Sequence, residues 1–248
     1  MTHAKWILLV SAVLFQDDPI AADALKGWKH PWADFGDGCS VTTHEILRAP
    51  DIDPTGKLIY KNVTTELKTT VLAMAGEKTN LKIEGVGQET YIPYFTSLPS
   101  WARGRGQKKG METIEVGGVK RECEVTEISF DTDKDVGQLT VICKSPQVPY
   151  WAVRWRTETL AQGKPNTSEE EVLLEVGVKL KVADRDISCV VVQSTIEVVG
   201  GPKTVKKEWR SEEIPGRVVK RESHQYLRGK EVESAYSQME VVKFTGKR

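Results

Sequence analysis

Alternating apolar and polar residues run through most of the chain after residue 38, and they predict β-strands rather than helices. Leu139, Val141 and Cys143 alternate onto one face of a strand, and Cys123 and Val125 share a face of the strand before it. The links between such strands are too short for crossover helices, so neighbouring strands should run antiparallel. The pattern predicts a mainly β protein, a large curved antiparallel sheet or half-barrel of about 11–12 strands, preceded by a short helical or irregular segment.

The same β unit occurs twice, at 113–157 and 179–223. Cys123 falls on Cys189 at an offset of 189 − 123 = 66 residues, and Pro149 falls on Pro215 without a gap. Six identities in the 45 aligned positions are only about twice the number that average composition gives by chance, but like residues also align elsewhere. We interpret this as a tandem β-meander repeat within a single β domain, 39–248.

The N-terminal region has two parts of different character. A basic residue, Lys5, precedes the ten-residue apolar run Trp6–Phe15, which is too short to span a bilayer as a helix. Residues 1–16 therefore read as a secretory signal peptide whose cleavage point could lie as late as residue 24. Residues 17–38 are rich in aromatic side chains, and we expect this segment to dock on the core.

Composition indicates an ordinary protein with no dominant charge. The chain has 248 residues, 39% of them hydrophobic, with Lys+Arg 35 balanced by Asp+Glu 35. No global basic field is present to recruit nucleic acid. The signal peptide predicts a secreted or periplasmic protein without a transmembrane anchor.

Export to an oxidising compartment would permit disulfides, and the four cysteines allow three full pairings. Cys123 and Cys143 are candidates for one bridge because both thiols should point inward. A symmetric hairpin places Cys143 opposite about Thr126, roughly 10 Å from Cys123, so a bulge would be needed to close the bond. In the second unit the position of Cys143 is taken by Trp209, which would pack over Cys189 instead.

Residues 87–110 interrupt the strand pattern with glycines, prolines and basic residues. We expect a long exposed loop here. Its four cations form a possible site for an anionic partner and are Arg103, Arg105, Lys108 and Lys109.

The sequence carries no recognisable motif of catalysis, metal binding or cofactor binding. The chain has no Gly-x-Ser-x-Gly and no His-Glu-x-x-His, and its cysteines and histidines lack the close spacing of zinc ligands. We therefore expect neither catalysis nor a cofactor.

Three stretches together resemble a known group of proteins: Pro31–Gly38, the Val116-Gly-Gly118 turn before Cys123, and Trp209–Lys220. They resemble uncharacterised secreted bacterial proteins with a half-barrel like that of periplasmic lipoprotein carriers and outer-membrane lipoprotein receptors (LolA/LolB-like). The resemblance extends over residues 31–245. It implies a curved sheet around an apolar cavity that receives acyl chains, and it assigns no ligand residue here.

These observations favour a non-catalytic secreted or periplasmic module that binds a lipid-like or apolar ligand in the concave face of its sheet. The alternative is a structural or protein-interaction module of the cell envelope with a filled core. A hydrolase is the third hypothesis, and it would require titratable groups with perturbed pKa values gathered in one cleft.

Overall fold

The fold was analysed in a computed structural model that describes residues 18–28, 30–75, 78–85, 87–95, 104–133, 136–148 and 150–246. The predicted signal peptide, 1–16, lies outside this part of the chain. The elements are α1 (Pro19–Ala24), β1 (Ser40–Ile52), β2 (Leu58–Ala75), β3 (Lys78–Gly85), β4 (Gln88–Phe95), β5 (Arg105–Val116), β6 (Val119–Asp133), β7 (Val136–Lys144), β8 (Arg154–Ala161), β9 (Lys164–Val182), β10 (Arg185–Val198), β11 (Pro202–Arg210), β12 (Val218–Leu227), β13 (Lys230–Glu231), η2 (Glu233–Ala235) and β14 (Ser237–Thr245).

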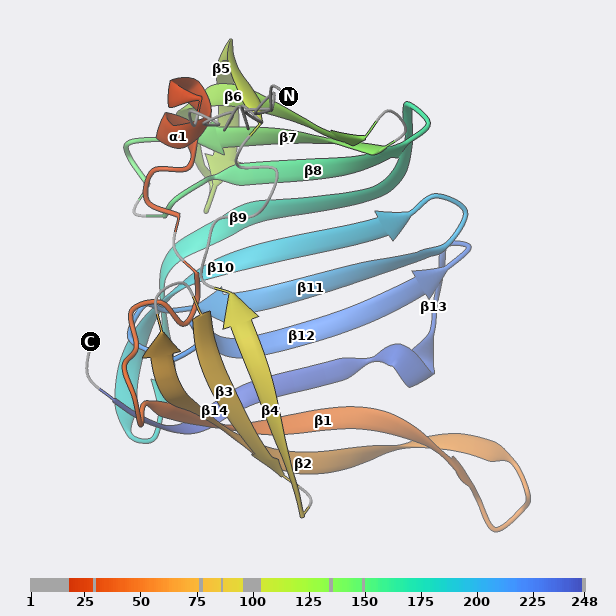
Figure 1. Ribbon diagram of the computed structural model, residues 1–248. Helices are drawn as coiled ribbons and strands as arrows, with labels where there is room; N and C mark the ends of the chain where they lie inside the picture. Colours follow the sequence, from red (N-terminus) through yellow and green to blue (C-terminus); the bar gives the residue numbers. More distant parts are fainter. Residues whose placement is uncertain are drawn as a thin grey trace, which may run out of the picture.

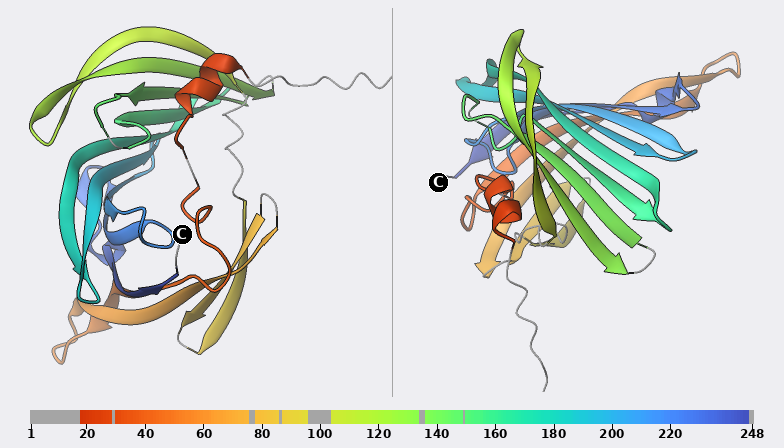
Figure 2. Two further views of the ribbon diagram at one scale, coloured as in Figure 1. Left: turned by 90° about the vertical axis from the view of Figure 1, so that its left-hand side faces the viewer. Right: turned by 90° about the horizontal axis from the view of Figure 1, so that it is seen from above.

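The strands form one antiparallel sheet with 14 members (Figure 1). Its order is β4-β3-β2-β1-β14-β12-β11-β10-β9-β8-β7-β6-β5, with β13 paired to β12. Seen from the side, the sheet curves through an arc whose two edges, β4 and β5, lie on either side of an opening (Figure 2). The prediction of a large curved antiparallel sheet is confirmed, although the sheet has more strands than the pattern indicated.

The predicted loop over residues 87–110 is wrong for most of its length. Residues 88–95 form β4 and residues 105–110 begin β5. Two glycines of this stretch are required by close packing rather than by flexibility. A Cβ added to Gly104 would lie 2.4 Å from the carbonyl oxygen of Ser129, and one added to Gly106 would lie 2.6 Å from the amide nitrogen of Ala21.

The repeated unit recurs in the sheet at the predicted offset, and it is longer than the sequence indicated. The first unit comprises β5–β8 and the second β9–β12. Three strands of the first unit end 66 residues before their counterparts in the second: β5 ends at 116 and β9 at 182, β7 at 144 and β11 at 210, and β8 at 161 and β12 at 227. Both units turn tightly through two residues of positive φ, Gly117-Gly118 in the first and Ala183-Asp184 in the second. Such turns suit the twist of a hairpin.

Each unit also builds an equivalent apolar cluster. The first contains Val116, Cys123, Cys143, Val148 and Val153. The second contains, at the matching positions, Val182, Cys189, Trp209, Ile214 and Val219. The prediction that Trp209 takes the place of Cys143 beside the second cysteine is confirmed.

The segment before β1 forms a strap along the inner side of the curved sheet (Figure 2). We call residues 18–28 and 30–38 the strap. Its first half is α1, which packs on β5 and β6. Its second half is held by Phe35, which is 2% exposed and packs with Cys39, Val71 and Leu81. The aromatic segment is therefore docked on the core, as predicted.

Candidate binding face

The apolar part of the concave face lies beneath α1. Ile128 on β6 and Ile142 on β7 are both completely buried, and Ala21, Ala24 and Leu25 of the strap cover them. Phe130, Trp151 and Trp155 border this cluster and are only partly buried. Burial of this group contributes most of the free energy that holds α1 in place, because a helix of six residues is not stable alone.

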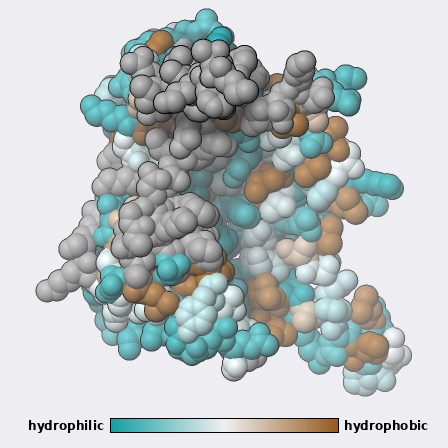
Figure 3. Space-filling model, in the orientation of Figure 1, coloured by the Kyte–Doolittle hydropathy of each residue, from teal (hydrophilic) through white to brown (hydrophobic). Residues whose placement is uncertain are grey.

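Polar side chains continue the same face beyond the apolar part. Ile142 pairs across the strands with Trp155, and one step along the strands Thr140 pairs with Thr157 and Thr157 with Glu169. The hydroxyl oxygens of Thr140 and Thr157 lie 2.9 Å apart in a buried hydrogen bond. In the space-filling view a recessed centre of mostly hydrophilic and neutral colour has hydrophobic residues beside it (Figure 3). The face is therefore amphipathic.

A buried charged network crosses this face in the second unit. Arg210 on β11 donates to Glu171 Oε2 at 2.7 Å, to Glu208 Oε2 at 2.7 Å and to the hydroxyl oxygen of Tyr150 at 2.8 Å. Arg221 donates to the other oxygen of Glu208. The two carboxylates belong to residues only 6% and 4% exposed.

The network shifts the ionisation of its members in opposite directions. Burial raises the pKa of Tyr150 to about 12, since the phenolate would be desolvated. Burial also acts to raise the pKa of Glu208, but Arg210 and Arg221 outweigh it and hold that pKa below its ordinary value. Beside the network, burial and the neighbouring Glu171 raise the pKa of Glu169.

These groups meet one condition set for a hydrolase, since titratable side chains with perturbed pKa values lie together. Each charge of the network, however, is bound by a neighbour of opposite sign, and none of the four charged residues lines either of the two cavities described below. A buried network of this kind fixes which strands and loops come together. It favours a structural role for Arg210 and its partners.

The predicted bridge between Cys123 and Cys143 is wrong, because both are free thiols. Cys143 pairs with Val125 across the strands, which leaves Cys123 two residues away along the same face. Diagonal neighbours of this type have Cα atoms about 7–8 Å apart, too far for a disulfide. Burial raises the pKa of Cys143 to about 11, so its thiol is unreactive at neutral pH.

Three of the four cations of the predicted anionic-partner site, Arg105, Lys108 and Lys109, lie on β5. The fourth, Arg103, lies outside the described residues. Arg105 is exposed at the start of the strand. Lys108 pairs with Glu124 at 2.5 Å and Lys109 with Glu127 at 2.8 Å. These two carboxylates on β6 offset part of the positive charge, so an anionic partner at this edge stays a prediction.

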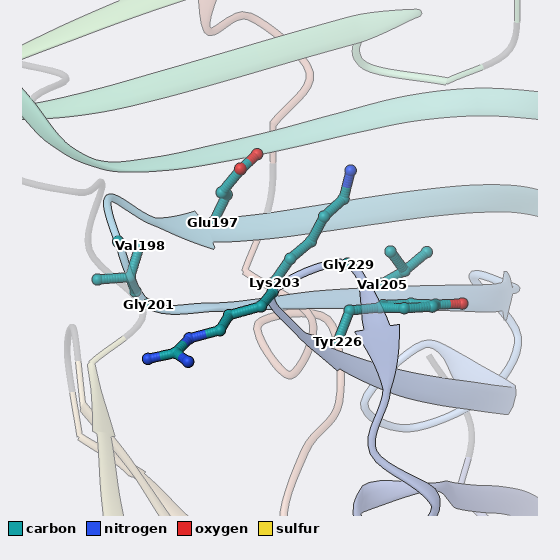
Figure 4. Close-up of a pocket in the computed structure, with 9 residues that line it drawn as sticks. Glu197, Val198, Gly201, Lys203, Val205, Tyr226 and Gly229 are labelled. Carbon is teal, nitrogen blue, oxygen red and sulfur yellow. The ribbon is translucent and has the colours of Figure 1, made fainter.

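A cavity of about 650 Å³ lies at the hairpin ends of the second unit (Figure 4). It is lined by Glu197, Val198, Gly200, Gly201, Lys203, Val205, Tyr226, Arg228 and Gly229. Lys203 pairs across the strands with Glu197 and Tyr226. Lys206 lies three residues after Lys203 on β11 and faces the concave side. Because successive side chains of a strand alternate between the two faces, Lys203, Glu197 and Tyr226 lie on the opposite, outer face.

A second cavity, of about 590 Å³, lies between β1, β2 and η2 and is lined by Arg48, Tyr60, Lys61, Asn62 and Glu233. Among the described residues no set of three or more His, Cys, Asp or Glu side chains is arranged to hold a metal ion. No helix in that part of the chain has the length and apolar character needed to cross a bilayer.

Sequence reasoning missed both the apolar cluster under α1 and the charged network. The internal repeat carried a usable signal for them. At the offset of 66 residues Ile128 aligns with Ser194 and Ile142 with Glu208, which shows that two apolar positions of this face are polar in the second unit.

No family model, no curated protein and no solved structure matches this chain.

Proposed function

We propose that the protein is a non-catalytic secreted or periplasmic module that binds a lipid-like ligand in the concave face of its sheet. The observation that carries this proposal is the cluster around Ile128 and Ile142, an apolar area on the inner face of an open sheet whose cover is a six-residue helix. Partly buried Phe130, Trp151 and Trp155 extend this area.

The neighbouring polar face supports an amphipathic rather than a purely apolar ligand. An acyl chain would lie along the cluster, where it gains about 25 cal/mol for each Å² of apolar area removed from water. A polar headgroup would reach the row that contains Thr157 and Glu169, next to Lys206. A few polar groups beside an apolar surface are the usual design of small-molecule sites.

The second candidate is an envelope scaffold or protein-interaction module. It is favoured by the two apolar clusters of the repeat and by the lining of both cavities, which includes no residue of the cluster under α1. In that case the concave face serves only to hold the strap.

Native mass spectrometry of protein purified from a secreting host without detergent separates the two. A stoichiometric adduct that is lost on denaturation and identified by solvent extraction supports the binding module. The matched variants are Ile142→Glu, which places a charge in the apolar cluster, and Thr113→Glu on the outer edge strand β5. The proposal requires Ile142→Glu to lose the adduct while Thr113→Glu keeps it. A bare mass for the wild-type protein, with no uptake of the apolar probe N-phenyl-1-naphthylamine, would leave the scaffold as the better account.

A further inference from the structure

We propose that the first half of the strap, residues 18–28, lifts off the concave face as a unit and that the lipid-like ligand takes its place. The inference rests on the proposed function and names the regulation of that site. Three features carry it: how α1 is seated, how the two halves of the strap differ, and what fills the equivalent place in the second unit.

The contacts of α1 with the sheet are made mostly by small residues. Two side chains of the helix are buried, both of them alanines, Ala21 and Ala24, and Leu25 at the C-cap is buried beside them. Gly106 allows the backbone of the helix to approach β5, since a Cβ there would lie 2.6 Å from Ala21 N. The carboxylate of Asp18 caps the helix by accepting from the amides of Ile20 and Ala21. The helix thus covers Ile128 and Ile142 of the sheet with two alanines and the Leu25 at its C-cap.

One side chain of the sheet is hydrogen-bonded to the C-terminal end of this helix. Lys144 Nζ donates to the carbonyl oxygens of Asp23 and Lys26, at 3.0 and 2.9 Å. The carbonyls at a helix C-terminus carry partial negative charge, so the ammonium is favourable there. Lys144 lies on the same face of β7 as Ile142, two residues away. Loss of the ammonium should therefore loosen α1 without altering the paired strands.

The second half of the strap is anchored far more firmly. Phe35 is buried among Cys39, which directly precedes β1, and Val71 and Leu81 of the sheet. Arg217 forms an ion pair with Asp34 at 2.7 Å. Gly216 accommodates the ring of Trp32, which a Cβ would approach to 2.7 Å. Gly27, with a φ of +89°, lies between the two halves. A pivot near Gly27 would free α1 and leave the anchor in place.

The repeat shows why this place can be vacated. Arg210 is the equivalent of Lys144, and it binds Tyr150 in the loop between β7 and β8. The covering segment of the second unit is thus a loop fixed to the sheet at both ends. In the first unit this loop contributes only Ala152 to the buried cluster, and the rest of the cover is the strap, which joins the described sheet through β1 alone. Of the two equivalent covers, α1 is the one that can leave without breaking strand pairs.

Amide hydrogen exchange on the full chain tests this opening without any ligand. The amides of Ala22 and Leu25, bonded to Asp18 and Ala21 within α1, should exchange faster than the amide of Gly38, bonded to Val71, and faster than amides of β7. Lys144→Met keeps the aliphatic stem and removes both hydrogen bonds, and exchange in α1 should rise about tenfold or more. Lys181→Met, at a position 70% exposed, is the matched control and should change nothing in the strap.

A second variant guards against an uninformative result. Ala21→Asp places a charge in the seat of the helix and should open α1 even if Lys144→Met acts weakly. Exchange of α1 in step with β7 in every variant would overturn the inference, because the strap would then open only with the whole sheet.

Probe binding then separates the two proposals. Since apparent affinity scales with the population of the open state, Lys144→Met should bind N-phenyl-1-naphthylamine about tenfold more tightly than Lys181→Met. Opening of α1 without uptake of the probe by any variant would refute the binding function. Uptake of the probe with α1 closed in every variant would refute the exchange of strap for ligand and leave the binding function standing.

Discussion

The buried network around Arg210 offers the most direct test of what holds the two units together. Arg210→Met removes the cation between Glu171 and Glu208 and leaves two carboxylates that are 6% and 4% exposed without their shared partner. Breaking a buried pair in this way costs about 3–5 kcal/mol, a large share of the ~5–15 kcal/mol that stabilises a typical protein. We expect a corresponding fall in the free energy of unfolding.

Urea denaturation followed by far-UV circular dichroism measures this loss. Arg156→Met is the control, because Arg156 pairs with Glu158 at 2.6 Å but is 49% exposed, and such pairs contribute about 0–1 kcal/mol. Adding Glu171→Gln to Arg210→Met should recover part of the loss, since Glu171 has lost the arginine that pairs with it, whereas Glu208 keeps Arg221. Equal costs for Arg210→Met and Arg156→Met would refute the reasoning.

Three further predictions concern the glycine seat, the histidine of the strap and the thiols. Gly216 and Gly229 both have a φ of +77°, so replacement by alanine imposes the same backbone strain at each. Only at Gly216 would the added methyl group also meet a tryptophan ring, that of Trp32. Gly216→Ala should therefore lower the free energy of unfolding, measured by thermal denaturation, by about 1–3 kcal/mol more than Gly229→Ala does. Burial, and to a smaller extent Arg217, lowers the pKa of His30 from 6.5. As the pH falls, the unfolded chain therefore binds this proton before the folded protein does, so the free energy of unfolding should decrease from about pH 6.5 down to the lowered pKa. Urea denaturation at successive pH values measures this decrease, which should be absent from His30→Gln. Cys123 and Cys143 should both be alkylated after unfolding without reductant and resist alkylation in the native protein; a peptide pair two mass units light would contradict the free thiols.

The sequence could predict the frame of the fold because the frame depends on local pattern. The offset that aligns Cys123 with Cys189 also aligns Val148 with Ile214, and in the structure each pair occupies matching clusters. Even the short bends agree, since Ser145 and Ser211 each accept a hydrogen bond from the amide two residues later. A pattern of turns and alternating apolar residues carries this information directly.

The strands around residues 87–110 could not be predicted because their glycines serve contacts distant in the chain. Gly104 is required by Ser129, and Gly106 by the helix that begins at Pro19. A local pattern records only that glycine is present, and glycine usually marks a turn. The disulfide failed for a related reason, since its geometry depended on the register between β6 and β7, which places Cys143 opposite Val125 and two residues from Cys123.

The comparison of the two units also indicates where function should be sought. Positions that fill the clusters are alike in both units, as with Val153 and Val219, because packing constrains them equally. Positions on the concave face differ in kind, as where Ile142 becomes Glu208, although the backbone around them is the same. Packing alone therefore does not dictate the character of that face. The charged face of the second unit is covered by the loop between β7 and β8, which is joined to the sheet at both ends, whereas the apolar face of the first unit lies under α1. A surface that is exposed only when a ligand binds is expected under a cover such as α1.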